Sequence, residues 1–300
     1  MADTGWPLMP KTVVAIGEAL WDVFPDQRRP GGAPCNVACH AARLGDRGVI
    51  ITRVGDDAAG EELVVFLRER GVVTDYVQCD DTRPTGTVSV TIEDLDPRYA
   101  IAEDVAWDYI AAEDDARALM RTADAICVGS LAQRREPSRE AIRQLLSEAR
   151  GQALVVFDVN LRPPFIDADV IDATFRVADV VKMSESEAAR LSTLLDRPSL
   201  IRWLLQSAGV QTVCVTRGKR GASITTPQGT VSTPGVEIDA SMGDAVGAGD
   251  AFTAAMAHQL VRNATPQGTL HAANRYAALV ATKQGAVPAL SFGDLAAIGL

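Results

Sequence analysis

The most informative stretch of this sequence reads GDAVGAGDAF, at residues 243–252, and leads into a predicted helix over residues 252–262. Three small residues in the middle of the stretch let the backbone approach a ligand closely. N–H groups at a helix start lack intrahelical acceptors, and the helix dipole adds partial positive charge there. The stretch therefore predicts an anion site formed by the backbone of Gly247, Ala248 and Gly249.

A carboxylate adjoins this predicted anion site, because Asp250 follows the three small residues directly. It would repel a bound anion unless it had another task. An alcohol that attacks phosphorus needs a base at its hydroxyl and hydrogen-bond donors at the developing negative charge. We therefore predict that Asp250 is the general base of a phosphoryl transfer. The alternative is that this carboxylate only caps the helix.

Other phosphate-binding motifs do not account for this stretch. No GxxxxGK[ST] pattern is present, and no lysine follows the glycines. The glycines precede a late helix rather than open the first strand–helix turn, as they would in a dinucleotide-binding fold. The HRD and DFG motifs of protein kinases are also missing.

Outward from this stretch, the chain alternates between strand and helix patterns. Helical spacing marks residues 33–44, 59–70 and 138–150. Short apolar or β-branched runs between such segments cover residues 12–16, 48–54, 125–128, 153–158, 180–183 and 212–216. Strands that are apolar on both faces, with helices between them, indicate a parallel sheet covered on both sides. The sequence therefore predicts an α/β fold.

One region departs from this alternation. Residues 85–92 (TGTVSVTI) and 99–102 alternate polar and apolar side chains on either side of a predicted turn at residues 95–98. This pattern predicts a half-exposed antiparallel hairpin. The hairpin either forms a solvated acidic surface or joins residues 22–32 in a small sheet that caps a cleft. No repeat or long linker divides the chain, so we expect a single domain over residues 1–300.

Composition narrows the classes of partner. The net charge of −10 and pI near 4.9 disfavour a nucleic-acid partner. No apolar run approaches the ~20 residues of a membrane-spanning helix, and the N-terminus does not resemble a signal peptide, so no membrane partner is expected. Five cysteines without a CxxC pair predict buried thiols in a reducing cytoplasm. Three histidines make a His-rich zinc site improbable.

A second group of polar residues lies near the N-terminus. Asp22 follows the first predicted strand, and the diglycine Gly31-Gly32 precedes a helix whose first turn carries Asn36. Ligands of open α/β sheets bind outside the carboxyl ends of the strands, so we expect Asp22 and Asn36 to reach one crevice. An acid and an amide together can hold the vicinal hydroxyls of a sugar. Alternatively, Asp22 is a surface turn residue and Asn36 only begins a helix.

Three further strand ends carry polar residues. In DVNLR (158–162), a period of two predicts that Asp158, Asn160 and Arg162 point to the same side. VVKMSESE (180–187) brings a lysine and two glutamates to another strand end. TRGKRG (216–221) forms either a phosphate-binding turn or a plain hairpin turn.

Four of these motifs occur in a characteristic order: GGAPCNVACHAARLG (31–45), DxNxR (158–162), TxGxxG (216–221) and DxxGAGDxF (244–252). Together they resemble the ribokinase-like (PfkB) carbohydrate kinases over roughly residues 12–290. The opening VVAIGEALWDVFP and the GGAPCN form are most similar to the fructokinase branch. The resemblance implies a ribokinase-like three-layer α/β/α sandwich with a mainly parallel central sheet. It also implies a small β-sheet lid from about residues 19–32 and 84–108.

The resemblance also assigns roles. Asp250 would deprotonate the sugar hydroxyl, and the amides of Gly247, Ala248 and Gly249 would hold the transferring γ-phosphoryl group. The positions that line the sugar side are Asp22, Gly31, Gly32, Asn36, Asn160 and Arg162. Those on the ATP side are Lys182, Ser184, Glu187, Thr216, Gly218, Gly221 and Asn274, the last on a predicted helix over residues 271–283.

Two cations are implied by the same resemblance. Glu187 matches a glutamate tied to Mg²⁺ through water, and Asp244 matches a ligand of a potassium-type monovalent cation. Two residues depart from the family pattern. Ser184 replaces an asparagine, and Ala245 replaces the usual threonine or serine.

The predicted function is an ATP-dependent sugar kinase in the cytoplasm, with fructose as the favoured acceptor. Ribose, a nucleoside and 2-keto-3-deoxygluconate are alternative acceptors. A non-catalytic protein that senses sugar or nucleotide is the alternative from another class. The hairpin further predicts a homodimer formed through the lid.

Overall fold

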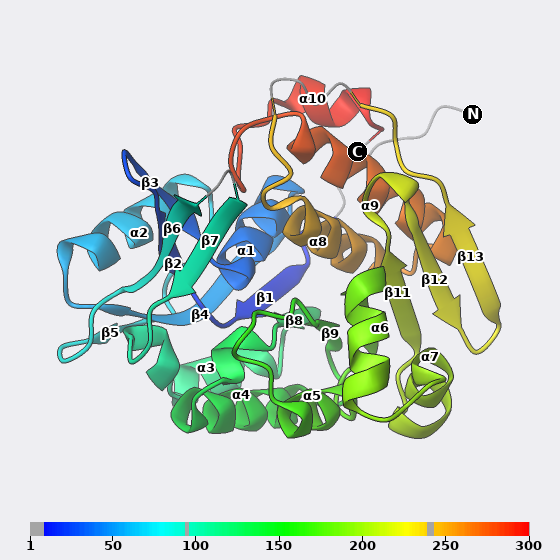
Figure 1. Cartoon of the computed structure of the whole chain (residues 1–300), viewed down its shortest axis with the longest axis horizontal. Coiled ribbons are helices and arrows are strands. Elements are labelled where there is room, and N and C mark those ends of the chain that lie inside the picture. The colour runs from blue at the N-terminus through cyan, green and yellow to red at the C-terminus, as the bar shows by residue number, and fades with distance from the viewer. Residues whose placement is uncertain (1–8, 94–95, 239–242, 300) are drawn as a thin grey trace.

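The computed structural model describes residues 9–93, 96–238 and 243–299 (Figure 1). Its centre is a nine-stranded sheet in the order β13-β12-β11-β10-β9-β8-β1-β4-β5. These strands are β1 (Thr12–Ile16), β4 (Arg47–Gly55), β5 (Val77–Asp80), β8 (Ala125–Val128), β9 (Leu154–Asp158), β10 (Val180–Ser184), β11 (Thr212–Thr216), β12 (Ala222–Thr226) and β13 (Gly229–Thr233). All neighbours from β5 to β11 pair in parallel, whereas β12 and β13 add an antiparallel edge.

Helices cover both faces of this sheet, which confirms the predicted three layers (Figure 1). One face carries α1 (Ala33–Arg43), α2 (Ala58–Glu69), α8 (Ala248–Leu260) and α9 (Pro266–Ala281), with α10 (Phe292–Ala297) beyond them. The other carries α3 (Asp114–Met120), α4 (Glu136–Ala149), α5 (Ala168–Phe175), α6 (Glu185–Leu194) and α7 (Leu200–Trp203). In the described part of the chain, no helix combines the length and apolar character needed to span a membrane.

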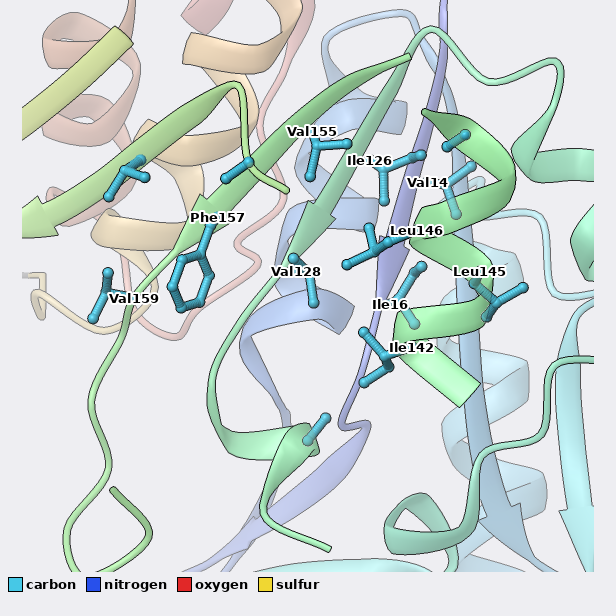
Figure 2. Close-up of a cluster of buried hydrophobic side chains, with 14 of the residues drawn as sticks. Val14, Ile16, Ile126, Val128, Ile142, Leu145, Leu146, Val155, Phe157 and Val159 are labelled. Atoms are coloured by element: carbon cyan, nitrogen blue, oxygen red, sulfur yellow. The ribbon is translucent and has the colours of Figure 1, made fainter. Parts of the chain in front are cut away.

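The two helical layers explain why the strands read as continuous apolar runs. Val14 and Ile16 of β1 pack toward α3 and α4, whereas Val13 and Ala15 pack toward α1, α8 and α9. Figure 2 shows the first of these clusters, with side chains of β1, β8 and β9 against Ile142 and its neighbours on α4. Both faces of β1 are therefore buried, as in other parallel sheets.

A separate four-stranded sheet has the order β3-β2-β6-β7. Its strands are β2 (Leu20–Val23), β3 (Arg28–Gly31), β6 (Gly86–Glu93) and β7 (Asp96–Ile101). The predicted hairpin thus pairs with the N-terminal segment, because β6 runs parallel to β2. The turn predicted at 95–98 is wrong for residues 96–98, which belong to β7, and residue 95 lies outside the described residues. Pro97 is tolerated there because β7 is an edge strand.

Two helices near the C-terminus begin earlier than predicted. Helix α8 starts at Ala248 rather than residue 252, and α9 starts at Pro266 rather than residue 271. Small residues open α8, and a capped proline opens α9, where the Thr265 side chain accepts a hydrogen bond from the backbone N–H of Gly268. Neither start shows in the apolar period, because the first turns carry few large apolar side chains.

Candidate active site

The loop before α8 presents backbone amides at a helix start. Gly247 is the N-cap residue in a left-handed conformation, with φ 74°. A Cβ at this position would lie 2.5 Å from the Cα atom of Ala286, so only glycine fits. The N–H of Ala248 makes only a long contact of 3.4 Å with the carbonyl of Ala245, and that of Gly249 has no acceptor within the described chain. These amides are therefore available to an anion.

Asp250 lies in the first turn of α8 and is half-buried. Its Oδ2 accepts a hydrogen bond of 2.7 Å from Nδ2 of Asn36, a residue of α1. Burial raises the pKa of Asp250 to about 6, although the Asn36 hydrogen bond opposes this shift. No side-chain capping bond is made at this helix start, so the alternative of a simple cap has no support. A carboxyl group with such a pKa can exchange a proton near neutral pH.

A buried ion pair lies beneath the same turn. Nζ of Lys182 on β10 is 2.9 and 3.1 Å from the two carboxylate oxygens of Asp158 on β9. The same ammonium donates to the carbonyl of Gly249 at 3.3 Å, and the hydroxyl of Thr253 donates to Asp158 at 2.6 Å. All three ammonium hydrogens thus have acceptors. The predicted contact of Lys182 with the nucleotide stays a prediction, and its described contacts support the loop.

Arg162 acts electrostatically on two of the carboxylates predicted for the site, Asp22 and Asp250. Asp22 is on β2, and a Cβ on Gly31 of β3 would lie 2.5 Å from its Oδ2, so glycine leaves room for this carboxylate. Burial raises the pKa of Asp22, and the positive charge of Arg162 opposes that shift. Arg162 also lowers the pKa of Asp250. The structure therefore joins Asn36 to Asp250 by a hydrogen bond, and the charge of Arg162 acts on both Asp22 and Asp250. That Asp22 and Asn36 reach one crevice stays a prediction.

The predicted alternation along DVNLR ends early. Strand β9 stops at Asp158, and Asn160 adopts a positive φ of 41°. The chain has left the strand conformation, so a period of two does not set the directions of Asn160 and Arg162. Asp158 is buried against Lys182, whereas Arg162 is exposed. The period of two therefore does not extend beyond Asp158, and the prediction that it points all three side chains to one side is wrong.

The predicted nucleotide side begins at the end of β10. Ser184 caps α6, and its Oγ accepts a hydrogen bond from the N–H of Glu187 at 3.2 Å. One carboxylate oxygen of Glu187 accepts from the N–H and hydroxyl of Ser184, and the other from the N–H of Leu161 at 2.7 Å. Ser184 is also the parallel partner of Thr216 on β11. Glu187 thus joins the DVNLR loop to the start of α6.

The TRGKRG turn lies next along the same edge of the sheet. It forms a short 3₁₀ helix (Gly218–Arg220) between β11 and β12, and Gly221 follows with φ 89°. Nδ2 of Asn274 on α9 donates to Oγ1 of Thr233 on β13 at 2.6 Å. No hydrogen bond or ion pair between described residues joins this turn or Asn274 to Asp250. The two predicted sides are therefore separate regions along one edge.

The two implied cations fit the residues differently. Glu187 already accepts three hydrogen bonds, which leaves it suited to a water-mediated contact with Mg²⁺ rather than direct ligation. Asp244 accepts from the N–H groups of Val246 and Gly285 at 3.2 Å and faces Nη1 of Arg29 at 3.4 Å. A guanidinium therefore already supplies positive charge at this carboxylate, which fits a monovalent cation poorly. The described residues form no cluster of three potential metal ligands.

Three site residues were not predicted. Thr253 contacts Asp158, Arg29 reaches Asp244 from β3, and Glu18 accepts a hydrogen bond from the N–H of Ala33. Glu18 had a usable signal, because it follows the carboxyl end of β1 even more closely than Asp22 does. The other two reach the site from parts of the chain whose spacing gives no such signal.

Free amides at a helix start, next to a carboxylate that can accept a proton, are typical of the active site of an α/β phosphotransferase. Comparison with known proteins makes this class specific. Residues 13–291 match the description "pfkB family carbohydrate kinase", and the chain belongs to this family.

Its relatives cover nearly the whole chain. A fructokinase of Vibrio alginolyticus is 32% identical over an alignment of 301 positions, which covers 93% of this chain and 95% of that protein. The structure of a fructokinase with bound ATP from Xylella fastidiosa has a TM-score of 0.87 at 25% identity and covers 97% and 98% of the two chains. A sugar kinase of Pyrococcus horikoshii in complex with ATP has a TM-score of 0.81 at 28% identity, covering 92% and 94%.

Proposed function

We propose that this carbohydrate kinase transfers the γ-phosphoryl group of ATP to a primary hydroxyl of a monosaccharide, with Asp250 as the base. The observation that carries this proposal is the geometry around Asp250. The carboxylate adjoins the free amides at the start of α8 and is held by Asn36 at 2.7 Å. Its pKa, raised to about 6 by burial, leaves it mostly ionised at neutral pH and able to accept a proton.

In the proposed reaction, the sugar oxygen forms a bond to the γ-phosphorus while the bond from that phosphorus to the bridging oxygen of ADP breaks. The hydroxyl proton passes to Asp250, and ADP leaves. The amides of Gly247, Ala248 and Gly249 donate to the oxygens on which negative charge develops. Mg²⁺, bound with the nucleotide, would neutralise part of the phosphate charge. Glu187 would hold a water molecule of that ion.

Asp22, Asn36 and Arg162 would orient the acceptor, because carboxylate, amide and guanidinium groups can together bind several sugar hydroxyls. Gly31, Gly32 and Asn160 would shape the same pocket. On the other side, Thr216, Gly218, Gly221 and Asn274 would contact ATP, with Ser184 and Lys182 beside the phosphates. We propose the small sheet (β2, β3, β6 and β7) as a lid over the sugar within one domain.

Fructose is the acceptor that we favour, since relatives with this activity in their names match over nearly the full chain. The test is a panel of fructose, ribose, a nucleoside and 2-keto-3-deoxygluconate, with ATP, Mg²⁺ and coupled detection of ADP. Fructose is expected to give the highest kcat/KM. Sugar-stimulated ADP release excludes a non-catalytic sensor. The guanidinium at Asp244 supports turnover without potassium, which the same panel tests by adding and omitting the ion.

The decisive variant is Asp250→Asn. It should keep the fold and ATP binding and lower kcat by at least ~100-fold, the effect expected from loss of a general base. Asp75→Asn is the matched control, because Asp75 is an exposed aspartate in the turn before β5. Turnover of the Asp250 variant near that of the wild type would remove the proposed role.

We also propose that the protein acts as a cytoplasmic homodimer joined through the lid. The edge strands β3 and β7 offer unpaired backbone groups to a second copy. All five cysteines are free, and four of them are buried, which suits a reducing compartment. Light scattering tests the dimer, and a mass of one chain at micromolar concentration would contradict it.

A further inference from the structure

Glu18 is a buried acid that the proposed reaction does not use. It lies just beyond β1, and only 4% of its surface is exposed. Its Oε1 accepts a hydrogen bond of 3.2 Å from the N–H of Ala33, the first residue of α1. Its Oε2 is buried without a hydrogen-bond partner in the described chain. A buried polar atom without a partner is costly, so this oxygen requires an explanation.

Asn36 also has a buried side-chain oxygen without a hydrogen-bond partner in the described chain. It lies one helical turn after Ala33, with 6% of its surface exposed, and its Nδ2 donates to Asp250. Its Oδ1 is buried and, among the described residues, has no donor. Two buried oxygens near the start of α1 therefore both lack a hydrogen. Of the two groups, only the carboxyl of Glu18 can acquire one, since a carboxamide oxygen accepts but never donates.

We propose that Glu18 is a positioning residue: in its protonated form it donates its O–H to Oδ1 of Asn36 and thereby holds the NH₂ of that amide on Asp250. The amide then links two carboxyl groups, accepting from one and donating to the other. This role rests on the proposed function, because it matters for turnover only if Asp250 is the base.

The electrostatic surroundings favour a neutral Glu18 next to an ionised Asp250. Burial raises the pKa of Glu18 to about 7, whereas its hydrogen bonds with the backbone and the charge of Arg162 lower it. The negative charge of Asp250 raises it further. The Cys39 side chain and burial, with a smaller contribution from the charges of both acids, raise the pKa of the Cys35 thiol well above its ordinary value, so this thiol stays neutral.

Asp250, with the lower pKa of about 6, loses its proton first. A single proton held by the two acids therefore favours Glu18. Because the two groups interact, the two limbs of a pH profile belong to the pair.

The test is the pH dependence of kcat/KM in wild type, Glu18→Gln and Glu18→Met. Wild type should rise as Asp250 ionises and fall above neutrality as Glu18 loses its donor. Glutamine carries an NH₂ donor at every pH, so Glu18→Gln should stay within ~3-fold of wild type at pH 6.5 and lose the falling limb. Glu18→Met has no donor and should lose ~10-fold, the equivalent of one hydrogen bond.

Two results would overturn the proposal: a falling limb that persists in Glu18→Gln, or equal activity of the Met and Gln variants. Urea unfolding of each variant shows whether it is folded. If Glu18→Met does not fold, the profile of Glu18→Gln alone decides. Failure of the proposed function is distinguishable, because it would appear as full turnover in Asp250→Asn whatever the profile of the Glu18 variants.

Discussion

Two carboxylates lie at the first turn of α8, and they differ in the groups that contact them. Asp158 lies beneath the turn and contacts the ammonium of Lys182 at 2.9 Å and the hydroxyl of Thr253 at 2.6 Å. Asp250 lies in the turn itself, and the hydrogen bond described for its side chain comes from the neutral amide of Asn36. Asp158 is buried and Asp250 is half-buried, so the main difference between the two carboxylates is the charge of the group that contacts each of them.

The partner decides what each carboxylate can do. An ammonium that is itself buried needs its counter-ion, and although burial disfavours its charge, Asp158 raises the pKa of Lys182 above the ordinary value. The pair is thus locked as a support for the Gly249 carbonyl. An amide orients a carboxylate without neutralising it, so Asp250 keeps a charge that a proton can cancel. Asp158 therefore serves stability, whereas Asp250 is able to take part in the proton transfer that we propose.

The largest effect expected from this comparison is on stability. Lys182→Met leaves the carboxylate of Asp158 buried without its counter-ion and should lower the free energy of unfolding by about 3–5 kcal/mol. Urea unfolding measures the loss. The double variant Asp158→Asn/Lys182→Met is the matched control and should recover much of it, because both charges are then absent. A loss below about 1 kcal/mol in the single variant would mean that the pair does not support the turn.

The next effect is on the pH profile. Asn36→Ala removes the hydrogen bond that lowers the pKa of Asp250, so this pKa should rise above about 6. Because the base must be ionised, the acid limb of kcat/KM should move to higher pH, and activity at pH 6 should fall. Asp75→Asn is the control, since that exposed aspartate lies in the turn before β5 and outside the proposed site. An acid limb that does not move in Asn36→Ala would break the proposed link between amide and base.

The smallest effect concerns a third carboxylate, Asp244, whose charged partner is about one-third exposed. Arg29 and Asp244 approach to 3.4 Å with side-chain exposures of 34% and 31%. Arg29→Met should therefore change the free energy of unfolding by only ~0.2–1 kcal/mol, and less at high salt. Urea unfolding at low and high ionic strength measures this. A loss as large as that of Lys182→Met would show that burial is not what separates the two pairs.

Much of the fold was predictable because apolar runs with clear ends coincide with strands. The predicted limits of β1, β8 and β11 agree with the structure to the residue. The starts of helices and strands were less predictable where they depend on small residues or proline rather than on an apolar pattern. Helix α8 begins at the small residue Ala248, and β7 includes Pro97, a residue that usually signals a turn.

The site was predictable only in part, for a related reason. Asn36 and Asp250 were each predicted as site residues at the start of a helix, but the hydrogen bond between them appears only in the structure. The role of Asp158 did not follow, because its partner Lys182 comes from the neighbouring strand, and residue spacing within one segment cannot show that pairing. The unmatched oxygen of Glu18 likewise appears only when burial is known.

The bond between Asn36 and Asp250 joins residues 214 positions apart in the chain, which has a consequence for biosynthesis. A ribosome that adds roughly 5–20 residues per second makes the amide roughly 10–40 s before the base. During that interval the nascent polypeptide carries the amide but not the proposed base. Phosphoryl transfer therefore cannot begin until translation is nearly complete, so truncated products should not consume ATP through this site.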